Sequence, residues 1–151
     1  MTTGSTVVKL ADFGLGKTLE TSSAYAQDSR LIGAVVYMAP EFFKANSGEK
    51  PKYKKSVDIW AFGCVVFELL HFKRLFAGAN YPIRLSNVCN DIRRPFEDDC
   101  PDKLKQLVID CTKKEPKERL SVAEVVDRIT QIKDSITDSI GLVNTKKTIL
   151  N

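Results

Sequence analysis

The chain has 151 residues, enough for one domain, and its 43% apolar and 28% charged composition excludes a disordered polypeptide. Lysine and arginine number 23 against 19 aspartates and glutamates, so the net charge of +4 gives no excess for binding nucleic acid. The longest apolar run, residues 59–70, contains Glu68 and falls short of the roughly 20 residues that a membrane-spanning helix needs. No secretory signal pattern opens the sequence. We therefore expect a soluble protein of the cytoplasm or nucleus that binds neither nucleic acid nor membrane.

The cysteines and the single histidine show no metal-ligand spacing. The cysteines stand at 64, 89, 100 and 111, and no pair has the C-x-x-C pattern of a zinc site. A chain of this length does not depend on a disulfide scaffold. We expect Cys64 to pack as a small hydrophobic residue and His71 to end a helix without a catalytic role.

The first third of the chain is predicted to hold only short elements. Residues 7–10 favour a short strand, and residues 15–36 have no steady period and indicate a long functional loop. Residues 39–44 are compatible with a short helix. The lysine-rich stretch 46–55 indicates a polar loop, either simply solvated or a docking patch.

Helices are predicted for most of the remaining chain. Residues 58–70 are apolar nearly all round, which favours a buried helix with Ser56 as its cap. A short helix is expected near 82–90, and residues 102–111 carry apolar side chains on one helical face. Residues 113–118 form a charged turn.

The final helix is predicted to begin at Ser121, where Ser121 and Glu124 match a capping box. Its apolar residues step by 3, 4, 3 and 4, a heptad-like seam. One interpretation is a helix that packs on its own domain, and the other is self-association through residues 122–136. Ile140 leaves this pattern, so we expect Gly141 to end the helix and residues 142–151 to be frayed. The seam residues are Val122, Val125, Ile129, Ile132 and Ile136.

Three separated motifs occur in a fixed order. Residues 9–14 read K-L-A-D-F-G, residues 33–41 read G-A-V-V-Y-M-A-P-E, and residues 58–63 read D-I-W-A-F-G, with Arg119 in a later E-P-K-E-R-L. This series resembles the C-terminal half of a eukaryotic protein kinase domain over about residues 5–131. D-F-G and A-P-E are known kinase signatures, and their ordered combination is far more specific than either alone.

The resemblance implies a mainly α fold: the C-terminal, large lobe of the α+β protein-kinase fold, with the N-terminal lobe absent. It implies a partial kinase domain over residues 1–138 and a C-terminal tail over 139–151. Tyr37 stands where tyrosine kinases usually carry tryptophan, so the sequence is similar to the serine/threonine branch. The stretches 58–70 and 76–80 resemble those of the NIMA-related kinases.

The resemblance also implies a role for individual residues. Asp12 matches the aspartate that binds magnesium, Phe13 the residue packed between the lobes, and Gly14 the hinge between active and inactive geometries. Residues 15–36 match the activation loop, and Gly33, Ala34 and Tyr37 lie in the substrate-binding loop. Glu41 and Arg119 are expected to form a buried ion pair. The remaining structural residues are Pro40, Asp58, Trp60 and Gly63. The candidate phosphorylation sites are Thr18, Thr21, Ser22, Ser23, Tyr25 and Ser29.

Several parts of a complete kinase have no counterpart in the sequence. It lacks a Gly-rich loop, a V-A-I-K lysine and an H-R-D-x-x-x-x-N catalytic loop. We expect a truncated kinase domain or partial gene model whose parent uses ATP and magnesium on protein substrates. The chain alone is expected to be inactive and to expose apolar surface.

Two functions remain open. Most serine/threonine kinases carry threonine where Ala34 stands, and that threonine contacts the catalytic aspartate. The alternative to a truncated active kinase is therefore a non-catalytic module that binds a regulatory protein. An unrelated small enzyme is the third possibility.

Overall fold

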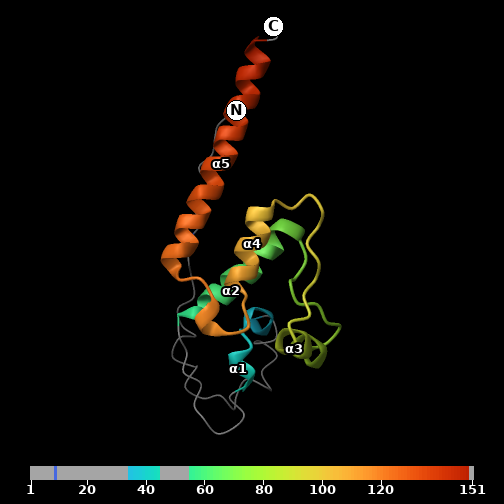
Figure 1. Cartoon of the computed structure of the whole chain (residues 1–151). Helices are drawn as coiled ribbons and strands as arrows, with labels where there is room; N and C mark the ends of the chain where they lie inside the picture. The colour runs from blue at the N-terminus through green and yellow to red at the C-terminus, as the bar shows by residue number, and fades with distance from the viewer. Residues whose placement is uncertain (1–8, 10–33, 45–54, 150–151) are drawn as a thin grey trace.

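The computed structural model describes Lys9 and residues 34–44 and 55–149, with the backbone alone for residues 34, 35, 44 and 139–149. The regular elements of these residues are all helical, which confirms the mainly α fold class (Figure 1). In chain order they are η3 (Ala34–Tyr37), α1 (Glu41–Lys44), α2 (Ser56–His71), α3 (Tyr81–Cys89), α4 (Asp102–Cys111), η5 (Pro116–Glu118) and α5 (Val122–Ile149). The strand expected at 7–10 and the loop at 46–55 lie almost wholly outside the described residues.

Helix α2 is the centre of the structure and contributes to two buried clusters. Trp60, Cys64 and Phe67 pack in one cluster with residues from the substrate-loop segment, α3 and α4. Ile59 packs in the other with residues from α4 and α5. Burial raises the pKa of the Cys64 thiol to about 12, which agrees with its predicted role as a small hydrophobic residue.

Helices α2 and α4 approach closely at Gly63. A Cβ atom added there would lie 2.6 Å from Thr112 Cγ2 and 2.8 Å from Cys111 Cβ. The absence of a side chain at Gly63 is therefore what allows this close packing.

The ends of α2 differ from the prediction. Ser56 is the first helical residue rather than the cap, and its buried Oγ has no hydrogen-bond partner among the described residues. The cap prediction was wrong because the helix begins at Ser56, two residues before the predicted start at 58, and Lys55 takes the cap position. One side of α2 is not buried: Val65 and Leu69 are 42% and 70% exposed, as expected of a lobe with exposed apolar surface.

The short helices follow the sequence pattern. Asn80 caps α3, its Oδ1 accepting a hydrogen bond from the Ile83 N–H at 3.1 Å, and α4 has the predicted bounds 102–111. No helix in the described part of the chain is long and apolar enough to cross a membrane.

Helix α5 begins as predicted and ends later than predicted. The capping box is present, because Ser121 N–H donates to Glu124 Oε2 at 2.7 Å and Glu124 N–H donates to Ser121 Oγ at 3.3 Å. Gly141 does not end the helix, which continues to Ile149 and extends past α2 and α4 (Figure 1). Glycine lowers helix propensity by about 1 kcal/mol but does not prevent helix continuation.

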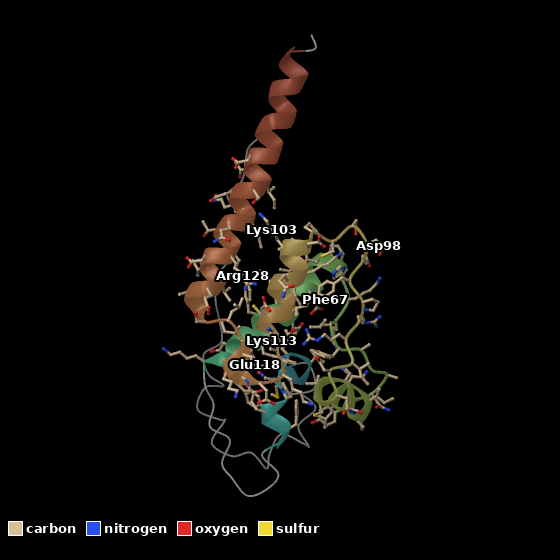
Figure 2. The ribbon with its side chains drawn as sticks, in the orientation of Figure 1. Phe67, Asp98, Lys103, Lys113, Glu118 and Arg128 are labelled. Carbon is tan, nitrogen blue, oxygen red and sulfur yellow. The ribbon has the colours of Figure 1, made fainter. Side chains whose placement is uncertain are left out.

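Salt bridges and hydrogen bonds join α5 to α4. Arg128 donates to Asp110 Oδ2 at 2.5 Å, and Lys103 Nζ donates to Ser135 Oγ at 2.7 Å (Figure 2). Partial burial by itself would raise the pKa of Asp110. Hydrogen bonds from Arg128, Gln106 and Lys113 outweigh that effect and lower it.

Candidate functional site

The segment 34–44 packs against the centre of the structure. It consists of η3, three residues without helical structure and α1, and these three include Ala39 and Pro40, both fully buried. Val36 in η3 is also buried. Segment 34–44 is therefore packed against the lobe through its buried residues.

Tyr37 links η3 to α2 by a hydrogen bond to Glu68, the only charged residue in the apolar run 59–70. The Tyr37 hydroxyl donates to Glu68 Oε2 at 2.5 Å. This hydrogen bond, with partial burial and the carboxylate charge, raises the pKa of Tyr37. It also explains how a carboxylate is tolerated in this run, because the charge is partnered and only partly buried.

Glu41 and Arg119 form the predicted ion pair across 78 residues of sequence. Arg119 Nη1 donates to Glu41 Oε1 and Nη2 donates to Glu41 Oε2, both at 2.7 Å. The Arg119 side chain is 0% exposed and that of Glu41 is 24% exposed. The planar guanidinium matches the carboxylate with two parallel hydrogen bonds, the strongest geometry for this pair.

Arg119 also satisfies its other N–H donors. A guanidinium has five N–H donors. Two go to Glu41, and the others donate to the backbone carbonyls of Ser56 (2.9 Å), Lys113 (2.7 Å) and Lys114 (3.2 Å). Arg119 thus joins α1, the start of α2 and the segment before η5, and its buried charge is fully hydrogen-bonded.

Trp60 of α2 contacts the Glu41–Arg119 ion pair, and we call these three residues the anchor. Its fully buried ring lies 4.9 Å from Arg119 Cζ, a cation–π contact, and stacks on Phe76 with ring centroids 5.4 Å apart. Trp60 thus packs in the core and also makes a cation–π contact that the sequence did not indicate.

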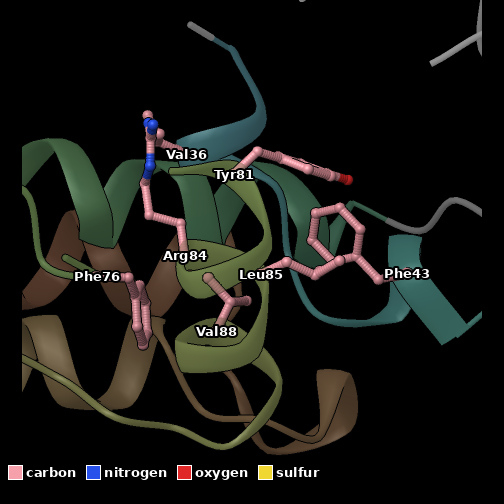
Figure 3. Close-up of a pocket in the computed structure, with 7 residues that line it drawn as sticks. All are labelled: Val36, Phe43, Phe76, Tyr81, Arg84, Leu85 and Val88. Carbon is pink, nitrogen blue, oxygen red and sulfur yellow. The ribbon is translucent and has the colours of Figure 1, made fainter. Parts of the chain in front are cut away.

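A small apolar pocket adjoins the substrate loop (Figure 3). The face of α3 forms one wall, and Val36 of η3 and Phe43 of α1 approach it from the other side. Arg84 is the one charged residue in the lining. The lining residues are Val36, Phe43, Phe76, Tyr81, Arg84, Leu85 and Val88.

Several other predicted site residues do not contact Glu41, Arg119 or Trp60 in the described part of the chain, or lie outside it. Asp58 lies in the first turn of α2 as an exposed residue, and its predicted contact with a catalytic loop stays a prediction. Ala34 is the first residue of η3. The predicted magnesium site, the activation-loop phosphorylation sites and Gly33 lie outside the described residues. Within the described ranges, no three His, Cys, Asp or Glu side chains gather as a metal site.

His71 is the residue whose surroundings the sequence did not reveal. It is the last residue of α2, as predicted, but it is buried between Phe67 and Phe96, with ring centroids at 4.4 and 5.7 Å. Neither ring nitrogen has a hydrogen-bond partner in the described part of the chain. Phe96 is 25 positions away in the sequence, so no local pattern could have indicated this cluster.

Comparison with known proteins agrees with the motifs. The model of the family described as "Protein kinase domain" matches residues 1–129. The serine/threonine-protein kinase nekl-2 of Caenorhabditis elegans is 34% identical over 121 residues, which are 80% of this chain and 32% of that protein. The serine/threonine-protein kinase Nek9 of Mus musculus is 36% identical over 128 residues, 83% of this chain and 12% of that protein. The chain thus spans about a third or less of these curated relatives, and their names agree with the NIMA-related resemblance.

Proposed function

This chain belongs to the serine/threonine protein kinase family, and from that membership we propose that it is the substrate-side lobe of a kinase. The parent protein would transfer the γ-phosphoryl group of ATP to serine or threonine hydroxyls of proteins. In this proposal the chain supplies the D-F-G segment, the activation loop and the substrate-binding loop.

The observation that carries the proposal is the double anchoring of segment 34–44. Tyr37 binds Glu68 of α2 at one end, and Glu41 binds the buried Arg119 at the other. Phosphoryl transfer depends mainly on positioning, and a displacement of the acceptor hydroxyl by about 1 Å can lower the rate about a hundredfold. A substrate loop tied to the central helix through Tyr37 and to the buried Arg119 through Glu41 supports this requirement.

The magnesium and nucleotide roles rest on the sequence motif. The Asp12 carboxylate is a hard oxygen ligand of the type that magnesium prefers. Magnesium-bound ATP would supply the transferred phosphoryl group and neutralise its developing charge. Phosphate on an activation-loop hydroxyl would order that loop by pairing with nearby cations. We propose that the whole protein works in the cytoplasm or nucleus.

The second candidate function is that of a non-catalytic kinase-like module that binds a regulatory protein. The feature that favours it is Ala34, which has no hydroxyl to contact a catalytic aspartate. In this alternative the anchored segment 34–44 would be a recognition surface only.

A chimeric kinase separates the two functions. The N-terminal lobe and catalytic loop of mouse Nek9 would be joined to residues 5–138 of this chain, and transfer of radiolabelled phosphate from ATP to a generic protein substrate would be measured. The kinase proposal predicts transfer that Asp12→Ala abolishes, and no transfer by residues 1–151 alone. Activity only after Ala34→Thr would favour the non-catalytic module. An inactive chimera with Ala34→Thr, beside an active Nek9 control, would refute the kinase proposal.

A further inference from the structure

The small pocket beside the substrate loop has an apolar floor and one charged side chain in its lining. Val36, Phe76 and Val88 are only 7%, 2% and 3% exposed, so they form the floor. Leu85 and Arg84 are partly exposed and lie at the opening. In Figure 3 the Arg84 side chain extends from α3 toward Val36 of η3. Ligand sites in proteins commonly combine such an apolar lining with a small number of polar groups.

Arg84 differs from the other buried or partly buried arginines that the structure describes. Arg93, Arg119 and Arg128 each pair with a carboxylate. The Arg84 Nε donates to the backbone carbonyl of Asn80 at 3.4 Å, and its side chain has no carboxylate partner in the described ranges. A guanidinium has five N–H donors, so most of its hydrogen-bonding capacity remains available to a ligand.

The stem of Arg84 is packed in place. It lies directly against Gly78, where an added Cβ atom would be 2.5 Å from Arg84 Cγ and 2.6 Å from Arg84 N. Arg84 also stands near the start of α3, whose first turn has no acidic residue, so the positive end of the helix dipole adds to the guanidinium charge. A ligand therefore meets an uncompensated positive charge whose stem is already packed, which lowers the entropic cost of pairing with it.

We propose that this pocket binds a segment of the protein substrate that carries an aliphatic side chain within two residues of an aspartate or glutamate. The aliphatic side chain would lie on the apolar floor, and the carboxylate would accept hydrogen bonds from Arg84, whose planar guanidinium matches it. Val36 belongs to both the pocket and the substrate loop, so a segment bound there lies beside that loop. Arg84 is then a residue that determines specificity. The inference rests on the proposed kinase function, because only that function makes the bound segment part of a substrate.

The first test measures peptide binding by the full 151-residue chain. Each protein carries Leu69→Lys, which replaces the most exposed aliphatic side chain of α2 and limits aggregation. The probes are short glycine–serine peptides with one leucine and with one aspartate at each of the two positions on either side of it. Binding is followed by the NMR shifts of backbone amides in α3 and segment 34–44. In the best of these arrangements, replacing aspartate with asparagine or leucine with serine is expected to weaken binding at least about threefold.

Substitutions of Arg84 separate its charge from its packing. Arg84→Gln keeps a stem against Gly78 and is expected to reduce the preference for aspartate over asparagine to less than about 1.5-fold. Arg84→Glu is expected to reverse the preference, so that a lysine peptide binds at least about twofold more tightly than the aspartate peptide. The matched control is Arg94→Gln, which removes the same charge from an exposed arginine outside the pocket lining and should leave the preference unchanged.

A second test uses the chimeric kinase with the Nek9 N-terminal lobe and catalytic loop. A serine is added to the preferred peptide as the phosphate acceptor. Arg84→Gln is expected to raise the KM of the aspartate form at least about threefold more than that of the asparagine form. A change in KM that is confined to the aspartate peptide identifies a binding contact, because a loss of folded protein would affect both peptides alike.

Equal binding of the aspartate and asparagine peptides by the wild-type chain would overturn the proposal. So would an aspartate preference that Arg84→Gln and Arg94→Gln reduce equally, because net charge rather than the pocket would then set it. An active chimera whose KM values do not respond to Arg84→Gln would show that the pocket does not select substrates. An inactive chimera, beside a chain that still prefers the aspartate peptide, would instead refute the kinase function and leave the pocket as a recognition site.

Discussion

Replacing Glu41 with glutamine tests whether the ion pair at Arg119 holds the structure together. The change preserves the shape of the side chain and one acceptor oxygen, but it leaves the buried guanidinium without its counter-charge. A hydrogen bond to a charged group contributes about 1.5–3 kcal/mol, and Glu41 is 24% exposed, so we expect a loss of about 2 kcal/mol in the free energy of unfolding.

Arg119→Ala is expected to cost more, about 3–5 kcal/mol. The substitution removes the partner of the Glu41 carboxylate. It also leaves the backbone carbonyls of Ser56, Lys113 and Lys114 without the Arg119 N–H donors. Arg119→Lys is intermediate, because an ammonium has three donors for five acceptors. Combining Arg119→Lys with Glu41→Gln should therefore cost less than the sum of the single changes, by about 1 kcal/mol.

Urea unfolding followed by Trp60 fluorescence measures these effects. Trp60 is the single tryptophan, and Arg119 lies 4.9 Å from its ring, so the probe is at the site. With an m-value of about 2 kcal/mol/M, Glu41→Gln should lower the midpoint by about 1 M. The matched control is Lys73→Ala, which breaks the ion pair with Glu97 between side chains 58% and 51% exposed, and should leave the midpoint unchanged. A neutral Glu41→Gln, or equal effects of the two variants, would refute the reasoning.

Features set by local sequence were predicted well. The bounds of α4, the capping box at Ser121 and the position of α3 follow from helical spacing and from side chains within one turn of each other. The Glu41–Arg119 pair was predicted at long range only through the resemblance, because no local pattern joins residues 78 positions apart.

Features set by packing between distant elements were not predicted. The spacing of Val122, Val125, Ile129 and Ile132 suggests one seam, and the positions of α2 and α4 decide which of them are covered. Likewise Ser56 has the chemistry of a cap, but the helix begins at Ser56 itself. Sequence pattern therefore locates helices better than it assigns their faces or their ends.

Three further changes probe other contacts. Gly63→Ala should destabilise the chain by about 1–3 kcal/mol in urea unfolding despite the better helix propensity of alanine, and adding Thr112→Ser, which removes the Cγ2 atom 2.6 Å from the new Cβ, should restore part of the loss. Asp110→Asn should reduce the loss in the free energy of unfolding that the wild type shows as the pH falls below about 4. The pKa of Asp110 is lowered by folding, so its contribution is present above the unfolded value near 3.8 and is lost as pH falls through the folded value. Tyr37→Phe should cost about 1 kcal/mol at neutral pH, because it removes the hydrogen bond to a partly exposed Glu68 carboxylate. Folding raises the pKa of Tyr37 above 10.0, so the contribution of its hydroxyl is complete below pH 10 and is lost as pH rises through the folded value. Thermal unfolding from pH 8 to 12 should therefore show a steeper alkaline loss of stability in the wild type than in Tyr37→Phe. Equal alkaline slopes would mean that Glu68 does not hold the tyrosine in its protonated form, and the anchoring of segment 34–44 would then rest on Glu41 and Arg119 alone.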